Sequence, residues 1–179
     1  GRRIKIIMIR QAGFGGGCHW CTEAVFSSLK GIVSVQQGWI ASTGSDTSFS
    51  EGVIVEYNDD IISFDTLIAI HLHTHSSTSQ HSMRGKYRSA IYTFNVQDAE
   101  SAKEAIETLQ PEFDSTIITK VLPYGAFTSS REELLDYYFN DPQKHFCELY
   151  INPKLKLIME RFSKFADTDK LRHLKQLDA

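Results

Sequence analysis

Cys18 is the residue of this chain whose setting best suits chemistry. It follows three glycines and opens the segment Cys-His-Trp-Cys-Thr-Glu-Ala-Val-Phe, in which apolar residues begin to recur at helical spacing. A thiol at the start of a helix faces free backbone N–H groups and the positive end of the helix dipole, which stabilise a thiolate. The glycines let another molecule approach the backbone, and Trp20 offers a flat apolar wall. The sequence therefore predicts a thiolate active site at Cys18.

A second cysteine three residues later adds redox chemistry to this prediction. Free cysteines are most often small buried hydrophobic residues, so core packing is the ordinary alternative. Cys18 and Cys21 form a Cys-X-X-Cys pair, which occurs in zinc sites and in thiol–disulfide exchange. A structural zinc site needs two more ligands, whereas Cys147, the remaining cysteine, has no second cysteine near it. The pattern favours redox chemistry over structural zinc.

Three alternate histidines, His71, His73 and His75, suggest a metal site. They lie in a segment with a helical pattern, on which only His71 and His75 share a face. His81 is available as a third ligand, but no aspartate or glutamate falls at the spacing that would complete the site. We predict no metal, and expect a polar rim beside the active site instead.

Composition and charge narrow the class of protein. The chain has 179 residues, 41% of them hydrophobic and 23% charged, with a net charge of −3. These values are ordinary for one soluble globular domain and make a nucleic acid an unexpected partner. No apolar run approaches the ~20 residues of a membrane span. Three cysteines do not make a disulfide framework, so we expect a reducing, cytoplasmic location and a monomer.

The elements that must position the cysteines follow from hydrophobic periodicity and from helix and strand boundary residues. Strands are expected at residues 4–10, 32–41, 52–57, 88–95 and 116–122. Helices are expected at 18–30, 63–73 (capped by Ser63), 96–109, 131–139, 142–150 and 153–165.

The order of the first six elements is strand, helix, strand, strand, helix, strand, as in split βαβ folds. We predict an α+β class: a ferredoxin-like split βαβ sandwich with added C-terminal helices. One domain is expected at residues 1–165 and a C-terminal tail at 166–179. Arg84, Lys86 and Arg88 are expected to form an exposed basic edge.

Four short segments carry a family resemblance. Gly17–Trp20 reads Gly-Cys-His-Trp at a helix start, Phe49–Val53 reads Phe-Ser-Glu-Gly-Val before a strand, and Lys86–Tyr92 reads Lys-Tyr-Arg-Ser-Ala-Ile-Tyr. These resemble the Gly-Cys-Phe-Trp, His-Ala-Glu-Ala-Val and Gln-Tyr-Arg-Ser-Ala-Ile-Tyr motifs of the A-type peptide methionine sulfoxide reductases. A weaker match runs from His145 to Pro153. The resemblance covers about residues 4–155.

The sequence departs from this family at several positions. His19 stands where the family has phenylalanine, and Ser82 where it has an acidic residue. The segment from Trp39 to Glu51 is shorter than usual, and a family tyrosine that hydrogen-bonds the substrate oxygen has no clear counterpart there. No cysteine follows Cys147, whereas the family usually carries a recycling cysteine in a glycine-rich C-terminal tail.

The resemblance implies a role for each candidate residue in the reduction of methionine-S-sulfoxide, free or in proteins. Cys18 attacks the sulfoxide sulfur and becomes a sulfenic acid. Glu51, protonated in an apolar pocket, gives its proton to the oxygen, and Tyr87 adds a hydrogen bond to it. Trp20 forms the wall for the S-methyl group. His19 either lowers the pKa of Cys18 when charged or lies at the rim of the substrate site.

The recycling thiol remains open between Cys21, which we favour, and Cys147, with direct reduction by an external thiol as a third route. A thioredoxin-like dithiol is the expected reductant, and no other cofactor is expected. Two other functions stay open: a Cys-X-X-Cys thiol–disulfide oxidoreductase, and a non-catalytic relative that binds oxidised methionine.

Overall fold

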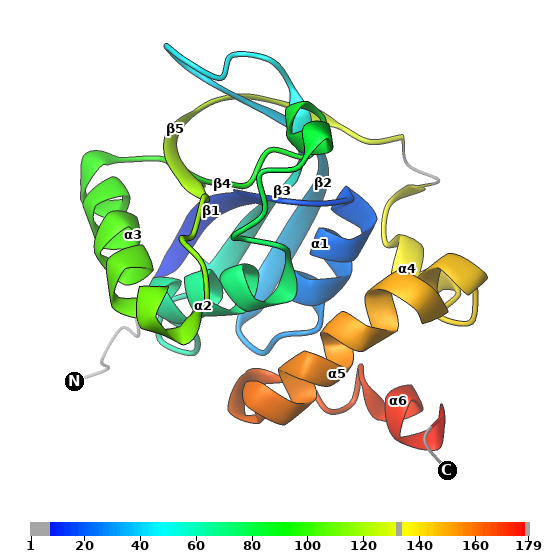
Figure 1. Cartoon of the computed structure of the whole chain (residues 1–179). Helices are drawn as coiled ribbons and strands as arrows, with labels where there is room; N and C mark the ends of the chain where they lie inside the picture. The colour runs from blue at the N-terminus through cyan, green and yellow to red at the C-terminus, as the bar shows by residue number, and fades with distance from the viewer. Residues whose placement is uncertain (1–7, 132–133, 178–179) are drawn as a thin grey trace, which may run out of the picture.

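The centre of the structure is a closed barrel of five strands (Figure 1). In this computed structural model, residues 8–131 and 134–177 are described. The strands are β1 (Ile9–Gly15), β2 (Ile32–Ser42), β3 (Ser50–Asn58), β4 (Ala90–Thr93) and β5 (Lys120–Ser129). Their order around the barrel is β1-β3-β2-β5-β4. The β4–β5 pair is parallel, and the other four pairs are antiparallel.

Closure of the sheet is the main difference from the expected sandwich. An α+β fold is present, and the first four strands are neighbours in the order β4-β1-β3-β2. However, β5 pairs with both β2 and β4 and so joins the two edges that an open sandwich leaves free. Closure removes both unpaired strand edges.

Helices lie around the barrel as Figure 1 shows, with α2 and α3 on one side and α4, α5 and α6 together at another. The helices are α1 (His19–Ser27), α2 (Phe64–Thr74), α3 (Val96–Leu109), α4 (Tyr137–Asn140), α5 (Asn152–Arg161) and α6 (Arg172–Leu177). Short 3-10 turns occur at Ser82–Gly85, Gln110–Glu112 and Ser163–Phe165, and a π turn at Cys147–Ile151 leads into α5. Ser63 caps α2 as expected, because its hydroxyl accepts the Thr66 N–H at 3.1 Å.

Several expected boundaries are wrong. The first strand ends at Gly15 and not at residue 10, and residues 4–7 lie outside the described part of the chain. The fifth strand begins at Lys120 and not at 116. It continues past residue 122 to Ser129, where Pro123 and Gly125 hide the strand pattern. The expected helices at 131–139 and 142–150 reduce to the short α4 and the π turn; residues 132–133 lie outside the described ranges.

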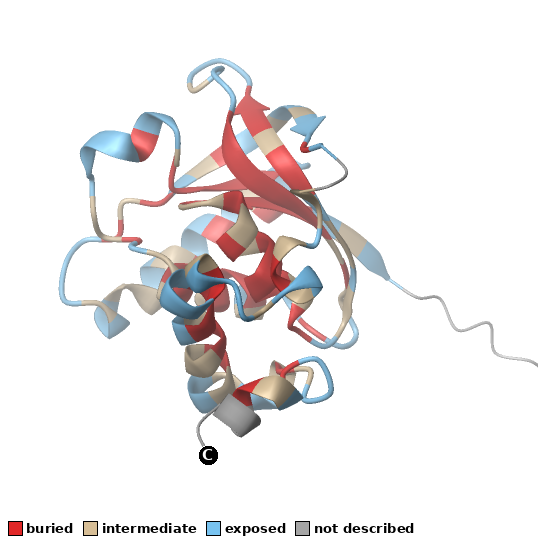
Figure 2. Cartoon of the chain, turned by 90° about the vertical axis from the view of Figure 1, so that its right-hand side faces the viewer, coloured by how far each residue is buried: buried red, intermediate tan, exposed pale blue. Residues whose placement is uncertain are grey.

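Two hydrophobic clusters separate the inside of the barrel from its helix-covered face. Side chains from four strands fill the barrel: Ile40, Ile54, Tyr92 and Leu122, with Ala90. The larger cluster joins α1, α2 and α5 to the outer face of β1 and β3. Figure 2 shows buried residues concentrated where the helices meet the barrel, with exposed residues in the surrounding loops.

Strand alternation sets the direction of Glu51. Successive side chains in a strand point to opposite faces, so Glu51 shares a face with Val53 and Val55, which pack in the helix-covered cluster. Ile54 points into the barrel. Glu51 therefore faces α1, the helix that begins at the candidate nucleophile.

The C-terminal segment packs on the domain. Leu171 and Leu174 are buried in the larger cluster, and the Tyr138 hydroxyl pairs with His173 Nε2 at 2.6 Å. The Asp167 N–H donates to the Ser28 carbonyl at 2.8 Å. Residues 166–174 thus cover the end of α1.

Two arginines of the expected exposed basic edge are buried instead. Arg84 is 8% exposed and Arg88 is 6% exposed, whereas Lys86 is exposed. Arg84 donates to the backbone carbonyls of Gly16 (2.9 Å), Tyr87 (3.0 Å), Ser79 (2.9 Å) and Ser76. A guanidinium with five donors in a rigid fork can satisfy several buried carbonyls at once, which explains a buried cation in a segment that looks like a polar loop.

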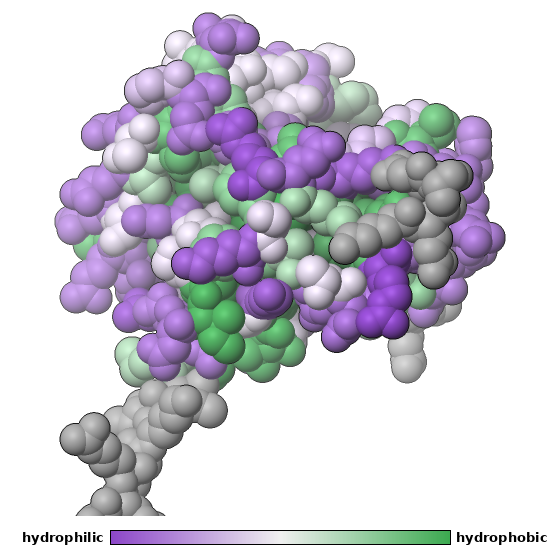
Figure 3. All heavy atoms as spheres, turned by 90° about the horizontal axis from the view of Figure 1, so that it is seen from below, coloured by the Kyte–Doolittle hydropathy of each residue, from purple (hydrophilic) through white to green (hydrophobic). Residues whose placement is uncertain are grey.

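The outer surface is mixed in character. Exposed large hydrophobic residues come from separate elements, among them Val33, Ile61 and Val96. The face seen from below is a mosaic of hydrophilic and hydrophobic side chains (Figure 3). None of the helices in the described ranges has the length and apolar character needed to cross a bilayer.

Candidate active site

Cys18 is the N-cap residue of α1, directly after the glycine turn that ends β1. Its carbonyl accepts the N–H groups of Cys21 at 3.1 Å and Thr22 at 3.2 Å, and its side chain is half-buried. The turn itself packs closely, because a Cβ at Gly16 would lie 2.4 Å from the ring of His75. The glycine sequence thus serves local packing and fixes where the helix begins.

The two thiols of the Cys-X-X-Cys pair have opposite electrostatic settings. The pKa of Cys18 is lowered, chiefly because Cys21 donates a side-chain hydrogen bond to its sulfur. The backbone N–H groups of Trp20 and Cys21 lower it further, while burial and the charge of Glu51 act in the opposite direction. The same hydrogen bond, together with burial, raises the pKa of Cys21. These effects favour the thiolate form at Cys18 and the protonated form at Cys21.

Lys154 and Cys147 lie near Cys21. The Lys154 ammonium, on the first turn of α5, donates to the Thr74 carbonyl at the end of α2, and Lys154 lines a cavity of about 40 Å³ together with Cys21. Burial lowers the pKa of Lys154, and its charge favours a thiolate at Cys21. Cys147 is fully buried in the same core cluster as Cys21, and burial raises its pKa.

Glu51 and His19 meet at the start of α1. Glu51 is 6% exposed and His19 is 4% exposed. Glu51 Oε1 lies 3.4 Å from the backbone N of His19 and 3.2 Å from its Nε2. His19 Nδ1 lies 2.9 Å from the Gly38 carbonyl oxygen on β2. The carboxyl group that is expected to supply a proton therefore contacts His19, the residue that directly follows the expected nucleophile.

Tyr87 reaches this region through the segment that precedes β4. The Glu51 N–H donates to the Lys86 carbonyl at 3.0 Å, so the segment is held against the start of β3. The Lys86 ammonium lies 3.8 Å from Glu51 Oε2 and 5.1 Å from the centre of the Tyr87 ring. Contact with Tyr87, and then the charge of Glu51, raise the pKa of Lys86. Ser82, at the position of the family acid, is exposed.

Trp20 does not stand alone beside the sulfur but packs in an aromatic cluster. Its ring stacks on Tyr137, with centroids 4.2 Å apart, and meets Phe146 edge-on at 5.5 Å. Glu23 fixes Tyr137 in place, because its buried carboxylate accepts the Tyr137 N–H at 3.2 Å and the Gln37 amide at 2.9 Å. Burial raises the pKa of Glu23.

The histidines of α2 support the glycine turn. His71 and His75 share a face as expected, with ring centres 4.1 Å apart. His71 Nε2 donates to the Gly15 carbonyl at 2.8 Å, and His75 Nε2 pairs with the Ser89 hydroxyl at 2.8 Å. Burial lowers the pKa of His71 to about 3. Among the described residues, no group of three or more histidine, cysteine or acidic side chains is placed to hold a metal.

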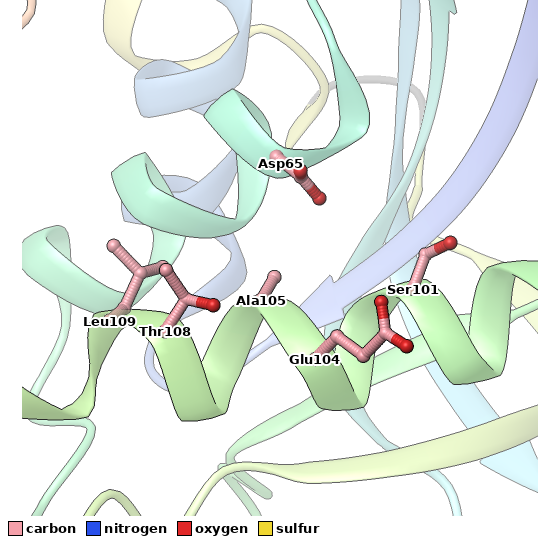
Figure 4. A pocket seen from close by; sticks show the side chains of 6 residues that line it. All are labelled: Asp65, Ser101, Glu104, Ala105, Thr108 and Leu109. Carbon is pink, nitrogen blue, oxygen red and sulfur yellow. The ribbon is translucent and has the colours of Figure 1, made fainter.

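A separate hollow of about 250 Å³ lies between α2 and α3 (Figure 4). Asp65 on α2 faces Ser101, Glu104, Ala105, Thr108 and Leu109 on α3. None of the cysteines lines it, so this hollow has no part in the thiol chemistry.

Sequence reasoning singled out seven residues. The structure brings five of them around one helix start: Cys18, Cys21, His19, Trp20 and Glu51. Tyr87 lies in the segment before β4, and Cys147 is buried in the core cluster.

Sequence reasoning missed Glu23 and Lys154, and it placed Arg84 on an exposed edge although this side chain is buried. Glu23 and Lys154 carry no local signal, because each acts on a segment distant in the chain. Lys86 does carry a local signal, because this chain has lysine where the resembled Gln-Tyr-Arg-Ser-Ala-Ile-Tyr motif has glutamine.

Comparison with known proteins identifies the family. A profile described as peptide methionine sulfoxide reductase matches residues 10–166. The peptide methionine sulfoxide reductase MsrA of Pasteurella multocida is 33% identical, covering 82% of this chain and 92% of that protein. The MsrA of Deinococcus radiodurans is 32% identical, covering 90% of this chain and 84% of that protein.

Solved structures agree with these matches. Methionine sulfoxide reductase A of Corynebacterium diphtheriae superposes with a TM-score of 0.66 at 26% identity, covering 76% of this chain and 77% of that one. Mxr1 of Saccharomyces cerevisiae, in complex with Trx2, shares the fold with a TM-score of 0.59 at 21% identity, covering 70% and 83%. The chain therefore belongs to the peptide methionine sulfoxide reductase family, and its activity is the reduction of methionine sulfoxide to methionine.

Proposed function

We propose that Cys18 is the nucleophile of this reduction and acts on methionine-S-sulfoxide, free or in proteins. The observation that carries the proposal is the pairing at the start of α1: the Cys18 sulfur is stabilised as a thiolate, and a buried carboxyl group, Glu51, contacts the next residue. A nucleophile and an acid side by side are what transfer of the sulfoxide oxygen requires.

The chemistry proceeds in one balanced step. The Cys18 thiolate attacks the sulfoxide sulfur, Glu51 delivers a proton to the oxygen, and the S–O bond breaks as an S–O bond to Cys18 forms. Methionine leaves reduced, and Cys18 is oxidised to a sulfenic acid. Tyr87 hydrogen-bonds the oxygen as negative charge develops there. Trp20 and His19 border the substrate methyl group.

Cys21 is the proposed recycling thiol, because it already hydrogen-bonds Cys18. Its sulfur condenses with the sulfenic acid, which releases water and forms a Cys18–Cys21 disulfide. Cys147 is the alternative, and its full burial makes it harder for a second protein to reach. We propose a thioredoxin-like dithiol as the external reductant, supported by the yeast relative that was solved with Trx2.

We propose that residues 1–165 form the reductase domain and 166–179 a C-terminal addition. The neighbour order β4-β1-β3-β2 supports a ferredoxin-like split βαβ origin for the first six elements. A monomer and a cytoplasmic location remain predictions.

The test is a reductant-free single-turnover assay on separate methionine-S- and methionine-R-sulfoxide. We expect methionine from the S form only, none from Cys18→Ser, and a large loss of rate in Glu51→Gln. Mass mapping of the spent enzyme should give a Cys18–Cys21 disulfide. With thioredoxin present, Cys21→Ser should still complete a first turnover but lose repeated turnover, whereas Cys147→Ser should retain both.

The outcomes separate the rival functions. Disulfide reduction that is indifferent to Glu51→Gln, without methionine formation, would indicate a thiol–disulfide oxidoreductase. Binding of oxidised methionine that survives Cys18→Ser, without sulfenic acid, would indicate a non-catalytic relative. A Cys18–Cys147 disulfide would transfer the recycling role to Cys147.

A further inference from the structure

His19 is a buried histidine whose two ring nitrogens both have partners. The chain carries it at the position where the resembled motif has phenylalanine. Its ring meets Trp39 edge-on, with centroids 5.1 Å apart, and Nδ1 lies 2.9 Å from the Gly38 carbonyl oxygen. A carbonyl oxygen can only accept a hydrogen bond. Nδ1 therefore carries a hydrogen, and this contact fixes the tautomer of the neutral ring.

The other ring nitrogen contacts the proposed acid. Nε2 lies 3.2 Å from Glu51 Oε1. With its hydrogen on Nδ1, a neutral imidazole offers only a lone pair at Nε2, and an ionised carboxylate offers only lone pairs as well. An attractive contact at this ion-pair distance requires one more proton, either on the carboxyl group or on the ring.

We propose that His19 and Glu51, in contact at ion-pair distance, carry a single proton between the two side chains, and that this is the proton delivered to the sulfoxide oxygen. The inference rests on the proposed function of Cys18 and deepens it. His19 acts through Glu51 as a positioning residue: its ring is the second site on which the proton can reside beside the carboxyl group until the substrate oxygen takes it.

The charged groups around Glu51 explain why a neighbouring imidazole matters. The titratable groups around the pair are Cys18 on the same turn, and Lys86 and Tyr87 from the segment before β4. The Lys86 ammonium, 3.8 Å from Oε2, favours an ionised carboxylate. Without another base, that charge would favour loss of the proton to solvent. An imidazole in contact with Oε1 retains the proton within the site.

The His19–Glu51 pair supplies the one proton that this reduction consumes. The Cys18 thiolate contributes an electron pair to the sulfoxide sulfur, and the shared proton moves to the oxygen. Methionine leaves, Cys18 bears the S–OH group, and the pair is left as a neutral imidazole beside a carboxylate. Solvent restores the proton before the next turnover.

The direct test is nuclear magnetic resonance of the histidine ring nitrogens in the reduced enzyme. Across about pH 5 to 9, the range in which imidazole titrates, the His19 Nδ1 signal should stay that of a protonated nitrogen. Nε2 should titrate, and Glu51→Gln should move that titration clearly to lower pH. Titration of His19 that is the same in both proteins would overturn the proposal, whether or not the enzyme is active.

The kinetic test uses the ratio of single-turnover rates at high and low pH. A reference carboxyl group titrates near pH 4.3 and imidazole near 6.5. Loss of the ring should therefore move the alkaline limb of the rate–pH profile to lower pH. We expect the ratio of the rate at about pH 8.5 to the rate at about pH 6 to fall about fourfold in His19→Gln. His19→Phe, which fills the space without a nitrogen, should show the same change, and His81→Gln, on an exposed histidine, should not.

The two proposals fail separately. No methionine from the wild-type enzyme would contradict the function of Cys18, while the resonance experiment still decides whether the proton is shared. An active wild-type enzyme with the same pH profile in His19→Gln, at any overall rate, would overturn the role of His19 alone.

Discussion

Two residues of one type, three positions apart, have opposite chemistry at this site. Cys18 lies at the N-terminus of α1, and its pKa is lowered first by a hydrogen bond from Cys21 and then by two backbone N–H groups. Cys21, on the first turn, is buried and donates that hydrogen bond. Local contacts, and not residue type, therefore lower the pKa of one sulfur and raise that of the other.

A prediction at this scale concerns the reactivity of Cys18 toward iodoacetamide. Its alkylation rate should reach half-maximum at a lower pH than that of an ordinary thiol, because only the thiolate reacts. In Cys21→Ala the midpoint should move to higher pH, since the main stabilising hydrogen bond is lost. Mass mapping assigns the modified residue. Cys147→Ala is the matched control, and an unchanged midpoint in Cys21→Ala would contradict this account.

At the scale of elements, one buried side chain joins the segments that carry the site. Arg84 donates to carbonyls of the glycine turn, of the loop after α2 and of Tyr87. Burial lowers its pKa, but an arginine remains charged at neutral pH. The guanidinium therefore holds the turn before Cys18 and the backbone of Tyr87 in one arrangement.

Arg84→Leu should lower the free energy of unfolding by about 3 kcal/mol, because it leaves several buried carbonyls without a donor. Arg84→Lys should recover only part of this loss, since an ammonium cannot reproduce the planar fork. Urea denaturation measures both. Arg172→Leu, at an exposed arginine of α6, is the control and should change the stability by less than about 0.5 kcal/mol. Equal stability of Arg84→Leu and wild type would refute the role.

At the scale of the whole molecule, the closed barrel places neutral histidines in the core. His71 and His75 lie between α2 and the glycine turn, and burial lowers the pKa of both, that of His71 to about 3. In the unfolded chain each ring has an ordinary pKa near 6.5. The unfolded state therefore binds protons below that pH while the folded state does not.

Stability should consequently fall as the pH drops below about 6.5. The sign follows from the lowered pKa: stability is fully present above the unfolded value and is lost as the pH approaches the folded value. His71 alone should account for about 3 kcal/mol between pH 7 and pH 4. Urea denaturation at each pH should give a shallower pH dependence for His71→Gln than for wild type. His145→Gln, on an exposed residue, should keep the wild-type slope; equal slopes in all three proteins would contradict the argument.

Local patterns predicted part of the fold well, for reasons visible in single elements. The Ser63 cap, the alternation from Val53 to Tyr57 and the helical pattern of α3 depend on neighbours in sequence. The end of strand β5 was placed too early because Pro123 and Gly125 weaken its pattern, and its pairing with β2 and β4 outweighs that weakness. The expected helix at 153–165 is present as α5 and the turn after it, whereas the helices expected at 131–139 and 142–150 are shorter than predicted.

The sequence by itself determined that Cys18 begins a helix, that Cys21 follows on its first turn and which strand face carries Glu51, because helix starts and strand alternation are local properties. Only the tertiary structure decided that the ring nitrogens of His19 contact Glu51 and the Gly38 carbonyl, and that Arg84 is buried. It also decided that β5 closes the barrel. These contacts join residues that are distant in the chain. Local periodicity states which face of an element is covered, but the closure of the sheet and the packing of helices decide what covers it.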